Sequence, residues 1–188
     1  MNYYGAKQLA DSFRTVRKNT ITIAEEIGEE HYGFRAAPGT RTVGETLVHI
    51  AFSPTFNEQV NRVERRTTME GFDFPALMRR ITAEAEKPRS KSEILQLLRS
   101  KGDDFANWLE SLSDEFLGES ISMPPGGTPP SRTRFDMLLG VKEHEMHHRG
   151  QLMLIERMVG IVPHLTRAMQ ERMAAMTAGS NATASRPA

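Results

Sequence analysis

Four segments of the chain repeat apolar residues at intervals of three, four and seven positions, the spacing that gathers them on one face of an α-helix. The pattern covers residues 6–27, 42–65, 90–112 and 131–159. No useful stretch alternates apolar and polar residues with the period of two that a half-buried strand requires. Helices with one apolar stripe must bury it against one another. The pattern therefore predicts an all-α fold, a four-helix bundle whose facing helices can hold a binding site.

The boundaries of these helices carry recognisable signals. Thr42 with Glu45, and Ser90 with Glu93, have the form of capping boxes, in which two side chains satisfy free amides of the first helical turn. Pro54 is expected to kink the second helix. Residues 73–86 are expected to form a short extra helix, and the sequence MPPGGTPPS at 123–131 can only be a loop.

The length of 188 residues suits one domain, so we predict a bundle over residues 1–165 followed by a helical appendage and disordered tail over 166–188. The 24 basic residues equal the 24 acidic ones, which makes nucleic acid a poor partner. No segment has the apolar length of a membrane span or a signal peptide core, so we expect a cytoplasmic protein without a membrane partner. The absence of cysteine excludes thiolate ligands and a thiol nucleophile from the chain itself.

The most informative segment lies late in the fourth helical pattern and contains three histidines. His144 and His148 are four residues apart, about 40° around a helix, so both imidazoles project from one face. Apolar residues continue that face, so it points into the bundle. Two buried imidazoles need polar partners, and one metal ion would satisfy both. His147 leaves an alternative open, since a His144/His147 pair is also geometrically allowed, although the apolar continuation favours His148.

A third ligand is required for a firm site, and His49 is the best candidate because it lies on a helix face shared with Phe52 and Phe56. A single histidine on an apolar face is more often a core residue. The residues alone therefore leave His49 undecided.

A family resemblance bears on that choice. The chain resembles the DinB/YfiT-like metalloprotein superfamily in two segments, GETLVH at 44–49 and HEMHHRGQ at 144–151, and more weakly over roughly residues 5–165. The resemblance implies a four-helix bundle with extra short helices, in which His49, His144 and His148 bind one divalent metal ion. We expect zinc or nickel, although imidazole ligands also suit iron or copper. Glu45 and Gln151 are expected to orient the metal ligands or the substrate by hydrogen bonds, without binding the ion themselves.

The same letters allow a rival interpretation. Residues 144–148 satisfy HExxH, the zinc peptidase helix in which the glutamate, here Glu145, is the general base. The longer metzincin pattern fails, because Gln151 and Leu154 stand where glycine and a third histidine belong. No predicted strand is available to bind a peptide, and Glu145 is expected instead at the surface or paired with another helix.

Three hypotheses therefore follow for the function. The resemblance implies a transferase that uses a low-molecular-weight thiol, such as bacillithiol or mycothiol, with a small-molecule substrate. The alternatives are a metal-binding or stress-related protein without turnover, and a peptidase. Arg149 is a candidate clamp for a thiol's carboxylate, although a salt bridge is the more ordinary role for it. The resemblance and the methionine-rich later helices also predict a homodimer.

Overall fold

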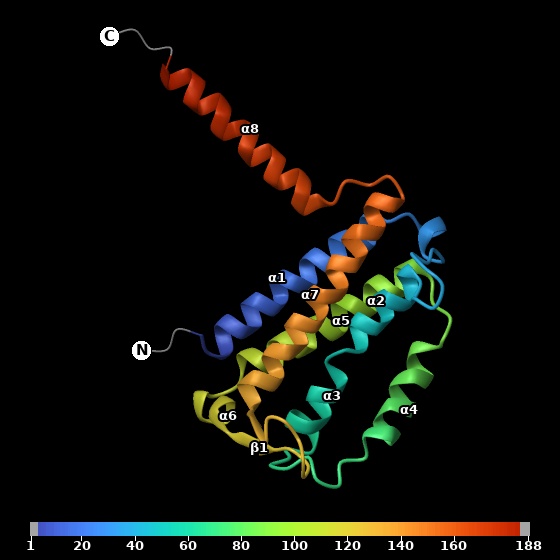
Figure 1. The fold of residues 1–188 in the computed structure, drawn as a ribbon, viewed down its shortest axis with the longest axis vertical. Coiled ribbons are helices and arrows are strands. Elements are labelled where there is room, and N and C mark those ends of the chain that lie inside the picture. Colours follow the sequence, from blue (N-terminus) through green and yellow to red (C-terminus); the bar gives the residue numbers. More distant parts are fainter. Residues whose placement is uncertain (1–3, 185–188) are drawn as a thin grey trace.

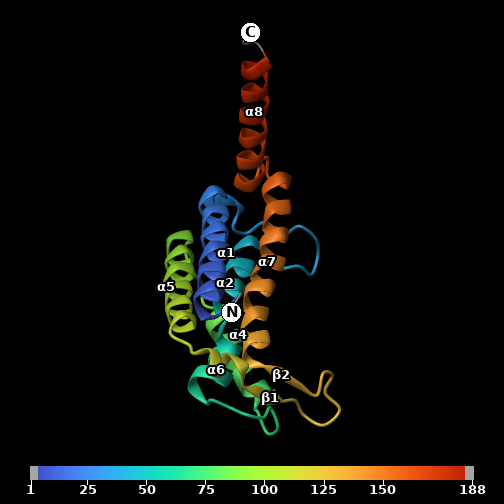
Figure 2. The ribbon, with the colours of Figure 1, turned by 90° about the vertical axis from the view of Figure 1, so that its left-hand side faces the viewer.

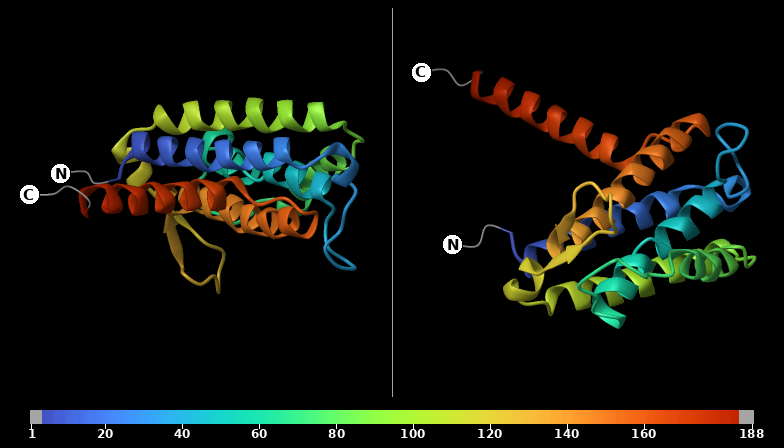
Figure 3. Two further views of the ribbon diagram at one scale, coloured as in Figure 1. Left: turned by 90° about the horizontal axis from the view of Figure 1, so that it is seen from above. Right: turned by 60° about the horizontal axis from the view of Figure 1, so that its bottom comes forward.

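The computed structural model describes residues 4–184 and confirms the predicted all-α bundle (Figure 1). The bundle consists of α1 (Ala6–Glu26), α2 (Val43–Phe52), α5 (Lys91–Glu110) and α7 (Arg134–Met158). α1 and α2 each contact both α5 and α7. Figures 2 and 3 show α5, α1 and α7 as neighbouring, roughly aligned rods. The apolar stripes of these four helices therefore meet in one interior.

The helix starts agree with the capping signals in the sequence. The hydroxyl of Thr42 accepts from the amide of Glu45 at 3.1 Å, and the Glu45 carboxylate accepts from the amide of Thr42 at 2.7 Å. Ser90 and Glu93 form the same reciprocal pair at the start of α5. Thr133 caps α7 by accepting from the amide of Asp136. These caps determine where α2, α5 and α7 begin, and α2 and α7 carry the candidate ligands.

The second predicted helix is interrupted at Pro54, as expected. It divides into α2, the single turn α3 (Thr55–Glu58) and the π-helical η2 (Gln59–Val63). The short helix predicted near residues 73–86 is α4 (Phe74–Ala85), which begins after an Asp73 cap.

Three small elements are absent from the sequence-based prediction. They are the 3₁₀ turn η1 (Glu29–His31), the short helix α6 (Asp114–Gly118) and an antiparallel hairpin of β1 (Ser120–Ser122) and β2 (Ser131–Thr133). The hairpin encloses the predicted loop and projects from one end of the bundle (Figure 2). Each strand has three residues, too few for an alternating pattern to be recognised.

A buried ion pair joins the four bundle helices. The Arg17 guanidinium of α1 binds the Glu145 carboxylate of α7 through Nε at 2.9 Å and Nη2 at 2.9 Å. The same guanidinium donates to the carbonyl oxygens of Leu98 in α5 and Ile50 in α2. Gly102 of α5 makes room for it, because a Cβ there would lie 2.8 Å from Cγ of Arg17. This contact fixes α7 against the other three helices.

The last helix, α8 (His164–Ala184), projects away from the bundle (Figure 1). Its base is held by an ion pair between Arg167 and Glu26 at 2.5 Å. The helix continues through Ala184, where the sequence predicted a disordered tail, because alanines at 178, 182 and 184 favour helix despite Gly179. Residues 185–188 of the predicted tail lie outside the described part of the chain. The domain boundary near residue 165 stays a prediction.

Within residues 4–184, no helix combines the length and apolar character needed to cross a bilayer.

Candidate metal centre

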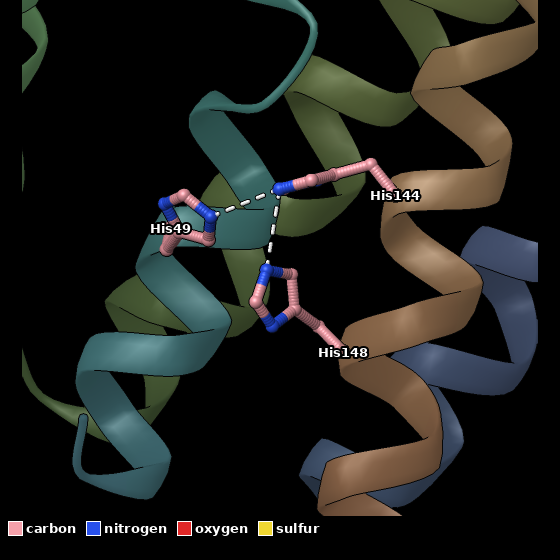
Figure 4. A group of neighbouring side chains, drawn as sticks. All are labelled: His49, His144 and His148. Carbon is pink, nitrogen blue, oxygen red and sulfur yellow. Dashed lines mark hydrogen bonds between the residues drawn. The ribbon is translucent and has the colours of Figure 1, made fainter. Parts of the chain in front are cut away.

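Three imidazoles from two helices converge at one point between α2 and α7 (Figure 4). α2 supplies His49, and one turn of α7 supplies His144 and His148. The Nε2 atom of His144 lies 3.1 Å from Nε2 of His49 and 3.2 Å from Nε2 of His148. His148 is only 7% exposed, and the other two rings are half-buried. The structure thus brings together the three histidines selected from the sequence.

Gln151 determines the tautomer of His148. Its amide oxygen, which can only accept, lies 2.8 Å from Nδ1 of His148. Nδ1 therefore carries the proton, and Nε2 presents a lone pair to the convergence point. The amide nitrogen of Gln151 lies 3.1 Å from Nε2 of His147 and donates to it. Gln151 therefore contacts His148 through its amide oxygen and His147 through its amide nitrogen, and its role in orienting a metal ligand stays a prediction.

Hydrogen bonds alone cannot satisfy this arrangement. A nitrogen of a neutral imidazole carries either a proton or a lone pair, never both. Since Nε2 of His148 is unprotonated and Nε2 of His144 faces both other rings, at most one of the two close contacts can be a well-directed hydrogen bond. A cation at the centre would give all three nitrogens a partner.

The rings are held in the neutral form that metal ligation requires. Burial is the main cause, and it lowers the pKa of His49 to about 4, with a smaller contribution from the charge of Arg41. Burial likewise lowers the pKa of His144 and His148. Nitrogens about 2.0–2.1 Å from a tetrahedral ion would stand about 3.3 Å apart, close to the two separations in the structure. The residues therefore fit a divalent ion with at least one position left for another ligand.

His147 lies outside this group. Its ring is exposed, and its one hydrogen-bond partner in the described chain is Gln151. The alternative pairing of His144 with His147 is therefore not the one that the structure adopts.

Glu145 is placed where it cannot serve as a peptidase base. Its side chain is fully buried, and its carboxylate is occupied by the Arg17 guanidinium on the side of α7 that faces α1. The expected pairing with another helix is confirmed, and the alternative surface location is wrong. The HExxH sequence lacks a free glutamate here.

Two other residues singled out from the sequence have different surroundings. The Glu45 carboxylate accepts from the Thr42 amide and from Arg35 at 3.0 Å, so its bonds go to the start of α2 instead of to His49. Arg149 has a buried Nε without a hydrogen-bond partner. It lines neither of the cavities beside the histidines, so the structure gives no support to the candidate role of Arg149 as a clamp for a thiol's carboxylate.

Two cavities flank the histidines. One, of about 620 Å³, is lined by His148 and Gln151 together with Arg35, Arg41 and Glu45. The other, of about 440 Å³, is lined by His49 and His144. The rest of its wall is largely apolar and includes Phe52, Phe56, Phe74, Met78 and Ile81. Arg35 and Arg41 could not be predicted as site residues, because they lie in the loop before α2, where no helical period indicates which side chains face the site.

Comparison with known proteins agrees with this architecture. The sequence matches the DinB superfamily over residues 12–152. YjoA of Bacillus subtilis is 24% identical over 155 residues, which cover 82% of this chain and 91% of YjoA. Its crystal structure, described as that of a DinB-like protein, superposes with a TM-score of 0.61 at 22% identity, and the match covers 81% of this chain and 92% of that one.

A second solved structure, that of YfiT from Bacillus subtilis, has a TM-score of 0.64 at 17% identity, covering 86% of this chain and 91% of that chain. YfiT is described as a probable metal-dependent hydrolase with an unusual four-helix bundle topology. At these identities the two structural matches establish the fold alone.

Proposed function

Since the chain belongs to the DinB superfamily, we propose that it is a metal-dependent enzyme that binds one divalent ion through His49, His144 and His148 and acts on a small molecule. One observation carries the proposal, namely the convergence of three Nε2 atoms that neutral imidazoles cannot satisfy among themselves. The description of YfiT as metal-dependent supports it. The two cavities beside the triad supply room for a substrate.

The finer proposal is transfer of a low-molecular-weight thiol to an electrophilic substrate. A divalent ion with an open position lowers the pKa of a bound thiol or water and so supplies a nucleophile at neutral pH. The chain contains no cysteine, so the thiol must come from solution. Gln151 holds the His148 ring by its Nδ1 proton, and the capped start of α2 determines the position of His49. The walls of the two cavities beside the histidines limit the amount of water around the reacting groups.

Hydrolysis is the second candidate, and the description of YfiT favours it. The same three ligands and the same open position would serve a water nucleophile. A metal-binding protein without turnover is the remaining alternative. The buried pairing of Glu145 with Arg17 counts against a peptidase.

The decisive experiment uses protein purified without a histidine tag and loaded in turn with zinc, nickel and cobalt. Each sample is given a panel of small thiols with an electrophile such as 1-chloro-2,4-dinitrobenzene, and separately an activated ester without thiol. Thiol-dependent acceleration that chelation abolishes supports the transferase, whereas ester cleavage without thiol supports the hydrolase. His148→Ala should abolish either activity, and the matched variant His147→Ala should retain it. Full metal occupancy with neither activity would contradict the enzymatic proposal.

A further inference from the structure

The two cavities differ in chemistry, and the difference follows from the elements that build them. The larger one lies against His148 and is walled by the loop before α2, which contributes Arg35, Thr40 and Arg41. The smaller one lies against His49 and His144 on the other side of the triad. Because the three ligand nitrogens converge and each cavity is lined by at least one of these histidines, both cavities border the convergence point.

Arg41 gives the larger cavity an uncompensated positive charge. In the described part of the chain it has no hydrogen-bond or ion-pair partner, whereas Arg35 is held by Glu45 and by the Thr40 carbonyl. Glu45 also lines this cavity, but its carboxylate is engaged by Arg35 and by the Thr42 amide. Arg41 and His148 line the same cavity, so the charge of this guanidinium lies beside the convergence point of the histidines. An anion in this cavity would therefore meet a free guanidinium beside the centre.

The smaller cavity is suited to an apolar group. Phe56 packs edge-on against Phe74 with ring centroids 5.8 Å apart, and both line the cavity with Met78. Phe74 is 49% exposed and Met78 is 38% exposed, so an apolar ligand would remove hydrophobic surface from water. The one charged side chain in this wall, Arg132, is engaged by Asp136 at 2.6 Å. An anion would find no free cation on this side.

We propose that the site takes an elongated small molecule with a carboxylate or similar anion at one end, held by Arg41, and an aromatic or branched apolar group at the other, held in the Phe56 and Phe74 cavity. This inference rests on the proposed function, because the ion at the three histidines holds the middle of the molecule. It assigns the anion-binding role to Arg41 in place of Arg149. Under the thiol proposal, this molecule is the thioether product, whose anionic thiol part lies on the Arg41 side and whose apolar part lies on the phenylalanine side.

Binding of three related thiols to the zinc-loaded protein tests the proposal by calorimetry. The probes are 2-benzyl-3-mercaptopropanoate, its methyl ester, and 3-mercaptopropanoate, which lacks the benzyl group. Zinc holds the sulfur of each probe as a thiolate. The wild-type protein should bind the benzyl acid more tightly than either of the other two probes. Zinc content is measured for every sample before titration.

Two variants separate the two ends of the molecule. Arg41→Gln should lower the affinity for the benzyl acid by about tenfold and change the affinity for the ester by less than about twofold, because the lost contact is a charge-assisted hydrogen bond at an exposed site. Phe74→Ala should lower the affinity for the benzyl acid by about fivefold and leave the affinity for 3-mercaptopropanoate unchanged. Two control variants lie outside both cavities: Lys18→Gln removes an exposed charge, and Val63→Ala removes an exposed apolar group. Neither variant should change the affinity for any of the three probes.

The outcomes distinguish this inference from the proposed function. Zinc-loaded protein that binds the acid no better than its ester, or an Arg41→Gln variant that weakens both equally, would overturn the inference while the metal site stands. An equal loss of both acids in Phe74→Ala would do the same. A protein that takes up no zinc would overturn both. Circular dichroism of each variant confirms that the helices are intact.

Discussion

Replacing Glu145 by glutamine tests the contact that positions the candidate ligands. The carboxylate is fully buried and accepts three hydrogen bonds from Arg17, at 2.9, 3.1 and 2.9 Å. A glutamine has one acceptor oxygen, and its amide protons would face the N–H groups of the guanidinium. Since Arg17 is itself only 4% exposed, its charge would stay buried without a counterion. Breaking a buried pair from one side costs about 3–5 kcal/mol. For a chain of this size that lowers Tm by roughly 6–20 °C.

Urea unfolding followed by circular dichroism measures the free energy of unfolding for this series. Glu143→Gln is the matched control, because Glu143 is an exposed carboxylate two residues earlier on α7, and it should change stability by less than about 0.5 kcal/mol. The double variant Arg17→Met with Glu145→Leu should be more stable than Glu145→Gln, because no unpaired charge remains. A loss below about 1 kcal/mol for Glu145→Gln would refute the reasoning, and so would a double variant at least as unstable as that single variant.

Three further predictions concern other parts of the molecule. Burial, aided by the charge of Glu26, raises the pKa of Glu156 to about 7; the folded state thus keeps a proton that the unfolded chain releases near pH 4.5, and stability falls as pH rises between these values. Glu156→Gln should therefore be more stable than the parent by about 3 kcal/mol at pH 8 and equal to it at pH 4, as measured by urea unfolding at each pH. Equal stability of the two proteins at both pH values would contradict this prediction. Gln151→Ala should lower the affinity for zinc about 10–100-fold in a competition titration, because His148 loses the acceptor for its Nδ1 proton. An unchanged zinc affinity would show that this hydrogen bond is dispensable. Sedimentation should give twice the 21.1 kDa mass of one chain, because the exposed Met169 and Met173 of α8 are expected to lie in a dimer contact. A monomer at micromolar concentration would contradict the predicted dimer.

Local signals in the sequence predicted the bundle helices well. Capping boxes and apolar periods act within a few residues, so Thr42 and Ser90 mark the starts of α2 and α5 correctly. Pro54 marks the break in the second helix because a proline removes a backbone donor wherever it stands. The spacing of His144 and His148 on one helix likewise placed their two rings on one face, whereas His49 was selected only through the family resemblance.

Contacts between distant segments were not predictable from such signals. The partner of Glu145 is Arg17, 128 positions away, and only the packed bundle brings the two together. Arg41 lies in a loop, where the orientation of a side chain depends on the local turns and cannot be derived from a helical period. The β1–β2 hairpin has strands too short for a pattern, and its pairing depends on the loop between them.

The metal content of protein purified without a histidine tag, measured by inductively coupled plasma mass spectrometry, decides whether the three histidines form a metal site. We expect about one zinc or nickel ion per chain, retained by His147→Ala and lost from His49→Ala, His144→Ala and His148→Ala, with each variant still helical by circular dichroism. Folded wild-type protein that neither carries a divalent metal nor takes one up on incubation would contradict the proposed site. A site that His147→Ala damages more than His148→Ala would contradict it as well.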